Sequence, residues 1–150
     1  MQLSQIEDRR EAMKVIFFDV DGVLNTIREF RVYGQNYIDH DKAMLLVRLA
    51  QSTGAMSVLS SSWRKEAESR AIVSDALRRQ GLDIHDDTPI FSAYVDRHVE
   101  IRRWLQDKHV ERFAIIDDDT RASIDGHFFK VDEDIGLTEE ICHQVHEFLY

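Results

Sequence analysis

The stretch Val15-Ile16-Phe17-Phe18-Asp19-Val20-Asp21-Gly22 places two acidic residues directly after an unbroken run of four apolar ones. An apolar run without polar alternation is typical of a central parallel strand that is buried on both faces. The acidic pair marks where that strand ends, and Gly22 allows the backbone to turn away immediately afterwards. We therefore expect a parallel sheet that carries polar groups where its strands end.

The rest of the chain alternates predicted helices with predicted strands. Four helices are predicted: residues 39–53, residues 65–80, Asp96 to about Lys108, and a last helix that begins at Thr138. Gly54 and Gly81 end the first two. The strand segments are 55–59, a short β-like piece at Ile90-Phe91, 113–116 and 127–131, and 23–38 is expected to be a polar connection. This alternation predicts an α/β fold of three layers, with helices on both sides of a parallel sheet.

The length of 150 residues suits one domain with a single core. Residues 1–12 are polar and only weakly periodic, so we expect an N-terminal extension there, followed by one domain over 13–150. No apolar run reaches the length of a membrane span, and the first residues lack the apolar centre of a signal peptide. The single cysteine, Cys142, excludes an internal disulfide and fits a reducing compartment, so a cytoplasmic location without membrane contact is expected.

The net charge of −9, from 19 basic and 28 acidic residues, bears on the class of partner. Binding along a nucleic-acid backbone requires a clustered basic surface, which this acidic balance argues against. The balance still permits a single terminal phosphate held by a few local arginines. We therefore expect no bulk binding of nucleic acid.

Three predicted strands end in polar clusters, which are Asp19/Asp21, Ser60-Ser61-Ser62 and Asp117-Asp118-Asp119. Ligands of open α/β sheets bind outside the carboxyl ends of the strands, so these distant segments should converge on one crevice. Paired carboxylates can present one oxygen to a metal ion and another to phosphorus, and Mg²⁺ prefers oxygen ligands. A hydroxyl and a basic side chain would hold the phosphoryl oxygens. The pattern predicts metal-dependent phosphoryl transfer.

Other interpretations of the same residues are weaker. In an EF-hand the loop glycine is the sixth residue, whereas Gly22 falls at the fourth position. A phosphorylation-receiver domain has its acidic pair first and a lone acceptor Asp on a middle strand, but here the middle strand ends in serines. Each acidic cluster could alone be a solvated turn, and Ser62 could serve as a helix cap. Arg97 is as compatible with an ordinary surface position as with a site.

The segment Phe18-Asp19-Val20-Asp21-Gly22-Val23-Leu24-Asn25 resembles the first motif of the haloacid dehalogenase (HAD) superfamily, whose phosphatases carry DxDG after their first strand. Val58-Leu59-Ser60-Ser61 is similar to the second motif and Ile115-Ile116-Asp117-Asp118 to the fourth. Together they span roughly residues 14–120. The segments 59–64, 115–119 and 136–140 further resemble the small HAD domains associated with Swiss Army knife RNA repair proteins. The resemblance implies a HAD-like, Rossmann-like fold, and the lengths of 23–38 and 62–95 leave no room for a large cap domain.

The resemblance also implies a role for each motif residue. Asp19 would attack phosphorus and form an aspartyl-phosphate, and Asp21 would act as general acid and base while its main-chain carbonyl binds the metal. Asp118 would bind the metal directly, with Asp117 behind it. Ser61 would hydrogen-bond the phosphoryl group, with Ser60 as the alternative. The basic residue of the third motif, usually a lysine, would be Arg97, and its rivals are Arg102, Arg103 and Lys108.

Several other residues have two interpretations. His143 and His146 lie one helical turn apart and could bind a metal, but without a third ligand a solvated helix face is favoured. Trp63 could stack on a substrate base or pack in the core, and packing is favoured for Trp104. Cys142 is expected to pack within its helix. Three arginines could contact a substrate phosphate or simply be surface residues, namely Arg28, Arg31 and Arg64.

The sequence thus predicts a Mg²⁺-dependent phosphomonoester hydrolase that works through an aspartyl-phosphate, on nucleotide or nucleic-acid terminal phosphates. The site would include Asp19, Asp21, Ser61 and Arg97 as catalytic residues and Asp19, Asp21, Asp117 and Asp118 around the metal. Two alternatives stay open. One is a phosphatase for small metabolites whose lid comes from an oligomer partner, and the other is a HAD-like binding or scaffold domain without turnover. The oligomeric state is open.

Overall fold

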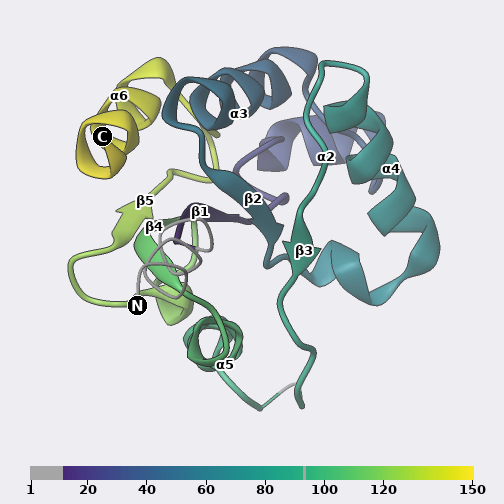
Figure 1. Cartoon of the computed structure of the whole chain (residues 1–150). Helices are drawn as coiled ribbons and strands as arrows, with labels where there is room; N and C mark the ends of the chain where they lie inside the picture. Colours follow the sequence, from purple (N-terminus) through teal and green to yellow (C-terminus); the bar gives the residue numbers. More distant parts are fainter. Residues whose placement is uncertain (1–11, 93) are drawn as a thin grey trace, which may run out of the picture.

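A five-stranded parallel sheet forms the centre of the computed structural model, which describes residues 12–92 and 94–150 (Figure 1). Its strands are β1 (Met13–Phe18), β2 (Met56–Leu59), β3 (Asp86–Asp87), β4 (Val110–Asp117) and β5 (Phe128–Lys130). Their order across the sheet is β3-β2-β1-β4-β5, so β1 lies in the middle between β2 and β4. The predicted parallel sheet is confirmed. The predicted extension over residues 1–12 falls almost wholly outside the described residues.

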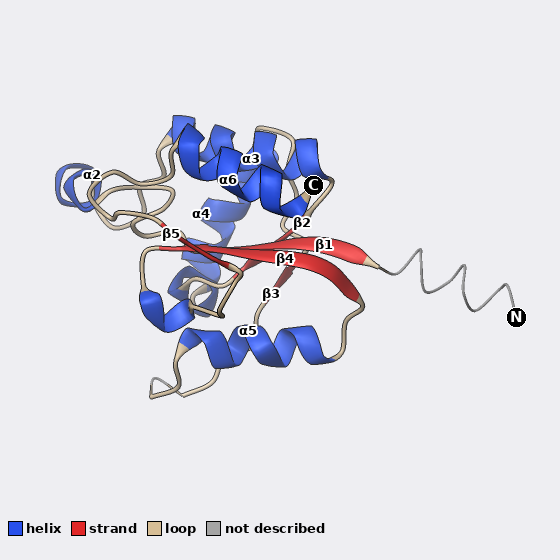
Figure 2. Cartoon of the chain, turned by 90° about the vertical axis from the view of Figure 1, so that its left-hand side faces the viewer, coloured by secondary structure: helices blue, strands red, loops and turns tan. Residues whose placement is uncertain are grey.

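Helices cover both faces of the sheet, as Figure 2 shows. They are α2 (Ile27–Tyr33), α3 (His40–Thr53), α4 (Ala67–Arg78), α5 (Arg97–Gln106) and α6 (Glu139–Leu149), with 3-10 turns η1 (Ser62–Lys65) and η2 (Thr120–Ala122). The buried residues of α3, α4 and α6 share one apolar cluster, and those of α5 lie in another on the opposite face. The predicted three-layer α/β architecture is therefore present.

The apolar run before Asp19 forms β1, the central strand, because its side chains can be buried on both faces of the sheet. Val15, Ile16, Phe17 and Phe18 have no exposed surface. Successive side chains of a strand point to opposite faces. Accordingly, Ile16 and Phe18 pack in the cluster beneath α3, α4 and α6, while Val15 and Phe17 pack against α5. The burial of this one segment joins the two halves of the core.

Helix ends follow the signals in the sequence. Asp39 accepts hydrogen bonds from the backbone N–H groups of Asp41 and Lys42 at the start of α3, and Gly54 ends the helix in the left-handed conformation, with φ of 71°. Thr138 caps α6 through the N–H of Ile141. The side chain of Asp96 precedes α5 but makes no capping hydrogen bond, and that helix ends at Gln106 rather than near Lys108.

Two segments differ from the sequence-based expectation. The connection 23–38 contains the helix α2, none of whose residues is buried, so it lacks the buried stripe by which helices are recognised. The short strand after α4 is Asp86–Asp87 rather than Ile90-Phe91, because Asp86 and Asp87 pair with Val58 and Leu59 of β2. No helix among the described residues has the length and apolar character needed to cross a membrane.

Candidate active site

The register of the three central strands brings the predicted motifs together. Phe18, the last residue of β1, pairs with Leu59 of β2 on one side and with Ile116 of β4 on the other. The residues that follow these three positions are therefore neighbours at the carboxyl edge of the sheet, here meaning the edge at which the parallel strands end. Asp19 follows β1 and lies beside Asp117, with which β4 ends. The expected convergence is present.

Three carboxylates form a compact acidic cluster at this edge. One oxygen each of Asp19, Asp117 and Asp118 lies within 4.8 Å of the others, and Asp19 and Asp117 are buried. When all three carboxylates are ionised, the single positive charge of Arg97 leaves two negative charges uncompensated, which a divalent cation would balance. Carboxylate oxygens are also the ligands that Mg²⁺ prefers. The donor set fits the predicted metal.

Arg97, at the start of α5, reaches into the acidic cluster. Its Nη1 lies 2.6 Å from Oδ2 of Asp117 and 3.3 Å from Oδ2 of Asp19. The three rival residues of α5 and its end make other contacts: Arg102 with His98, Arg103 with Asp107, and Lys108 with the ring of Trp104. The structure thus places Arg97 alone among the four candidates against the predicted nucleophile.

Burial and charge repulsion shift the titration of this cluster. Burial raises the pKa of Asp117 to about 9, Asp19 adds to the shift, and Arg97 opposes it. Burial, followed by the hydrogen bond and charge of Asp19, raises the pKa of Asp118 to about 6. Burial disfavours the charge on Arg97, but the nearby carboxylates of Asp19 and Asp117 outweigh it and raise the pKa of the guanidinium. Burial is therefore the largest cause of the raised pKa of both carboxyl groups, and the neighbouring carboxylate of Asp19 adds to it.

Both oxygens of Asp117 already have partners. Oδ2 accepts from Arg97, and Oδ1 accepts from the backbone N–H of Asp119 at 3.0 Å. Asp118 instead packs its carboxylate against Gly22, where a Cβ atom would lie 2.6 Å from Asp118 Oδ2. The two carboxylates therefore have different surroundings, and the metal roles expected for Asp118 and Asp117 stay predictions.

The turn after β1 orients the second carboxylate. Gly22 adopts a φ of 81°, and its N–H donates to the Oδ1 of Asn25 at 2.9 Å. The amide of Asn25 donates in turn to Oδ1 of Asp21 at 3.1 Å and to the carbonyl of Tyr37 at 3.0 Å. Asn25 is buried, and sequence reasoning assigned it no role. An Asn four residues after an acid in a glycine-containing turn is the available signal, because such amides commonly hold turns.

Ser60 and Ser61 are both fully buried but have different partners. The hydroxyl of Ser60 donates to the carbonyl of Phe18 at 3.2 Å, which uses its only hydrogen. The Oγ of Ser61 accepts from the N–H of Trp63 at 3.1 Å, and this bond does not use the hydrogen of the Ser61 hydroxyl. The expected contact of Ser61 with a phosphoryl oxygen stays a prediction. Ser61 rather than Ser62 is the N-terminal cap of η1.

Arg64 proves to be a structural residue. Its side chain is 2% exposed and pairs with Glu100 of α5 at 2.7 Å. It also donates to the carbonyls of Ser61 and Thr88, at 2.7 and 3.0 Å. Arg64 therefore fixes the chain at Ser61, and Glu100 is a second residue that sequence reasoning missed. A buried pair between residues 36 positions apart leaves no local pattern in the sequence.

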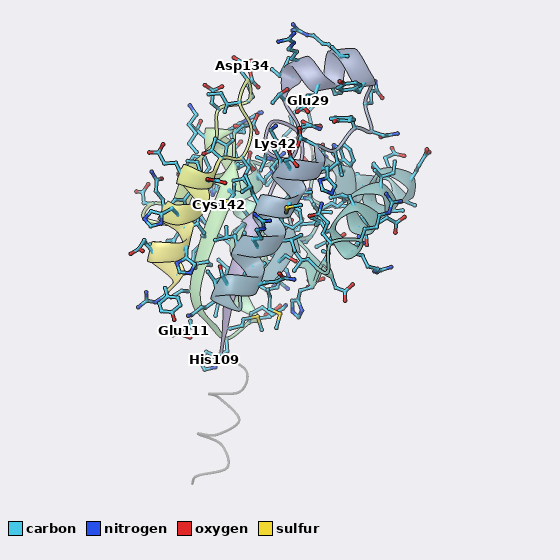
Figure 3. All side chains as sticks on the ribbon, turned by 90° about the horizontal axis from the view of Figure 1, so that it is seen from above. Glu29, Lys42, His109, Glu111, Asp134 and Cys142 are labelled. Atoms are coloured by element: carbon cyan, nitrogen blue, oxygen red, sulfur yellow. The ribbon has the colours of Figure 1, made fainter. Side chains whose placement is uncertain are left out.

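The other open residues fall into ordinary roles. Both tryptophans are buried, Trp63 in the apolar cluster beneath α3, α4 and α6 and Trp104 in the cluster beneath α5. Among the described residues, the three-aspartate cluster is the only group of at least three potential metal-ligating side chains, and it includes neither His143 nor His146. Cys142 is partly buried against α3, as Figure 3 shows, and burial raises the pKa of its thiol to about 12.

Comparison with known proteins supplies the family. The family model described as "HAD domain in Swiss Army Knife RNA repair proteins" matches residues 15–142, a stretch that contains every site residue named above. No curated protein and no solved structure gives a significant match. The fold, the order of the motifs and this match agree with the resemblance inferred from the sequence. The chain belongs to the family of HAD domains found in Swiss Army Knife RNA repair proteins.

Proposed function

We propose that this protein is a Mg²⁺-dependent phosphomonoester hydrolase that works through an aspartyl-phosphate on Asp19. Family membership supports a HAD-type phosphatase at the level of the superfamily. The observation that carries the proposal is the meeting of Asp19, Asp117 and Asp118 within 4.8 Å, with Arg97 at 3.3 Å from Asp19. Two anionic reactants can approach each other only where positive charge offsets their repulsion. Here Arg97 supplies such charge, and the three carboxylates would attract a metal cation.

The two aspartates of the turn would divide the reaction between them. Oδ1 of Asp19 accepts from the N–H of Val20 and Oδ2 faces Arg97, which orients the carboxylate for attack on phosphorus. As the new bond to phosphorus forms, the bond to the leaving oxygen breaks, and Asp21 donates its proton to that oxygen. Asn25 occupies Oδ1 of Asp21, so Oδ2 is the oxygen that carries the proton.

Hydrolysis of the aspartyl-phosphate reverses the role of Asp21. Its carboxylate takes a proton from water, whose oxygen attacks phosphorus and releases inorganic phosphate from Asp19. Arg97 and the hydroxyl group of Ser61 hold the phosphoryl oxygens during both steps. Asp19, Asp118 and the main-chain carbonyl of Asp21 would hold Mg²⁺, which would supply positive charge to offset the repulsion between nucleophile and phosphate.

The substrate we propose is the terminal phosphate of a nucleotide or of a nucleic-acid end. The chain between β1 and α3 adds only the seven-residue helix α2 at the carboxyl edge, so residues 12–92 and 94–150 contain no large cap domain that would restrict access to the site. An open site admits bulky or polymeric substrates. The family description, which refers to RNA repair proteins, favours nucleic-acid ends over small metabolites.

The test is phosphate release in Mg²⁺ from an aryl phosphate, nucleotides and oligonucleotides phosphorylated at the 3′ or 5′ end. Asp19→Asn removes the nucleophile and conserves size, while Asp125→Asn makes the same change at an exposed position and serves as the control. We expect activity in the wild type and Asp125→Asn and none in Asp19→Asn. Equal inactivity of all three on every substrate would indicate a binding domain, and undiminished activity of Asp19→Asn would show that another group attacks phosphorus.

A further inference from the structure

The helix α2 lies beside the active site without contributing to the core. None of its seven residues is buried, and Phe30 in its middle is 39% exposed. Figure 2 shows α2 projecting beyond the carboxyl edge of the sheet, away from the other helices. Apolar burial therefore does not account for a phenylalanine at this position.

Polar and aromatic contacts nevertheless hold α2 in place. Thr26 and Glu29 form a reciprocal capping box at its start. Lys42 of α3 lies 3.6 Å from the carboxylate of Glu29, and Figure 3 shows these two labelled side chains close together. At the other end, the ring of Tyr33, the last residue of α2, stacks on the ring of Tyr37 in the following segment, with centroids 4.5 Å apart. These contacts at both ends fix the direction in which Phe30 is presented.

Two hollows border Asp21, the proposed proton donor to the leaving group, and Phe30 lines both of them. The first hollow has a volume of about 390 Å³, within the range of roughly 300–1,000 Å³ of ligand pockets, and continues past Gln35 and Asn36. The second continues along Asn25 and Arg31. A leaving group whose oxygen is protonated by Asp21 can therefore extend into either of these hollows.

The first hollow is suited to an uncharged, hydrogen-bonding group. Its lining contains no Lys or Arg, and it includes Glu66 and Glu68, which would repel a further phosphate. The amides of Gln35 and Asn36 offer donors and acceptors to the edge of a base or to ribose hydroxyls. Phe30 adds the one exposed ring, and a flat aromatic face binds planar groups by stacking.

We propose that Phe30 is a specificity-determining residue that stacks on the base of the nucleoside carrying the phosphate. The inference rests on the proposed phosphatase function and deepens it: the preferred substrate is a phosphorylated nucleoside unit, whose base lies in the hollow next to Asp21. The unit can be a free nucleotide or the terminal residue of a strand, because both present the same base and ester.

Matched substrate pairs test this inference. Adenosine 5′-monophosphate and 1,4-anhydroribitol 5-phosphate share the ester oxygen and the furanose ring and differ only in the base, as do adenosine 3′-monophosphate and 1,4-anhydroribitol 3-phosphate. Strand ends are compared as 3′- and 5′-phosphorylated oligonucleotides with a normal or an abasic terminal residue. The variants are Phe30→Ala, Phe30→Leu, which keeps the apolar bulk but not the flat ring, and Phe30→Trp. The control Val32→Ala changes an exposed residue of the same helix that lines neither hollow.

Stacking of a base on an aromatic ring is lost on substitution by alanine, so kcat/KM for the base-containing member should fall at least about fivefold in Phe30→Ala and Phe30→Leu. The base-free member should stay within about twofold, Phe30→Trp should retain activity on both, and Val32→Ala should change neither. Because no residue of α2 is fully buried, the melting temperature should change little. If the protein hydrolyses only free nucleotides, or only phosphorylated strand ends, that result identifies which of the two is the substrate.

Two results would overturn the inference while leaving the phosphatase intact: an equal loss on both members of a pair, or no loss on either. A wild-type protein that hydrolyses no member of any pair would instead refute the proposed function itself, and the inference about Phe30 with it.

Discussion

A methyl group added at Gly22 should weaken metal binding through Asp118. Gly22 has a φ of 81°, and its Cβ would lie 2.6 Å from Asp118 Oδ2, whereas ordinary contacts begin at 3.4 Å. The carboxylate must therefore withdraw by about 0.8 Å. Mg²⁺ requires oxygen distances of about 2.0–2.1 Å in near-octahedral geometry, so a displacement of this size disrupts its coordination. We expect Gly22→Ala to lower the affinity for Mg²⁺ at least about tenfold.

Gly126→Ala provides a matched control. Gly126 has a φ of 83°, nearly the same as that of Gly22, and nothing lies within 4 Å of a Cβ added there. Both variants place a side chain in the left-handed region, which costs about 1–2 kcal/mol of stability. Only Gly22→Ala also moves a proposed metal ligand, so the difference between the variants isolates the effect on Asp118.

Thermal or chemical unfolding with and without Mg²⁺ measures that difference. At a Mg²⁺ concentration one hundred times the wild-type Kd, binding stabilises the native state by about 2.7 kcal/mol. A tenfold weaker site gains only about 1.4 kcal/mol at the same concentration. Gly126→Ala should keep the full gain. If Gly22→Ala gains as much from Mg²⁺ as Gly126→Ala does, then Asp118 is not the ligand that this account requires.

Three further predictions concern the charged groups and the thiol. Arg97→Met should lower kcat about 100-fold or more in a phosphate-release assay, with Arg97→Lys intermediate and exposed Arg102→Met unchanged, and a kcat within twofold of wild type for Arg97→Met would contradict the role of the guanidinium. Folding raises the pKa of Asp118 to about 6 and of Asp117 to about 9. The contribution of these two groups to the free energy of unfolding of the metal-free protein should therefore be greatest below about pH 4. That contribution should be lost as the pH rises through 6 and 9, and Asp117→Asn should flatten the slope measured by denaturant unfolding; an unchanged slope would remove the basis for these shifts. Since burial raises the pKa of Cys142 from 9.0 to about 12, iodoacetamide should alkylate the folded protein about 1,000-fold more slowly than the urea-unfolded chain near neutral pH, and similar rates would show that the thiol is not buried.

The parts of the fold that could be predicted are those whose sequence pattern and physical cause coincide locally. Val15 to Phe18 is apolar at every position because both faces of β1 are covered, and this can be recognised without any partner. Asp39 and Gly54 bracket α3 because a helix needs an acceptor at its start and a left-handed residue at its end.

The errors arise where tertiary contacts decide. The helix α2 shows no apolar stripe because it faces no core, and contacts with α3 and between Tyr33 and Tyr37 hold it. The strand β3 consists of two aspartates with low intrinsic strand preference, and it exists only because β2 offers a free edge. Ile90 and Phe91, which have the stronger strand preference, remain exposed.

The same distinction applies to the site. The position of Asp19 and Asp117 at the ends of adjacent strands follows from the strand pattern, so their meeting could be predicted. The contact of Arg97 with both depends on how α5 packs across the sheet, which the sequence does not specify, and four basic residues were therefore left in contention. The support that Asn25 gives to Asp21 is local but is visible only once the turn is formed.

The most direct test of the proposed mechanism is to trap the phosphoryl group on Asp19. The protein is mixed with Mg²⁺ and a substrate that it hydrolyses, quenched in acid during turnover, digested, and examined by mass spectrometry for the peptide that contains Asp19. We expect one added phosphoryl group on this peptide, absent in Asp19→Asn and absent when Mg²⁺ is chelated. Sustained turnover with no phosphoryl group on Asp19, or with the group on another residue, would contradict the proposed mechanism.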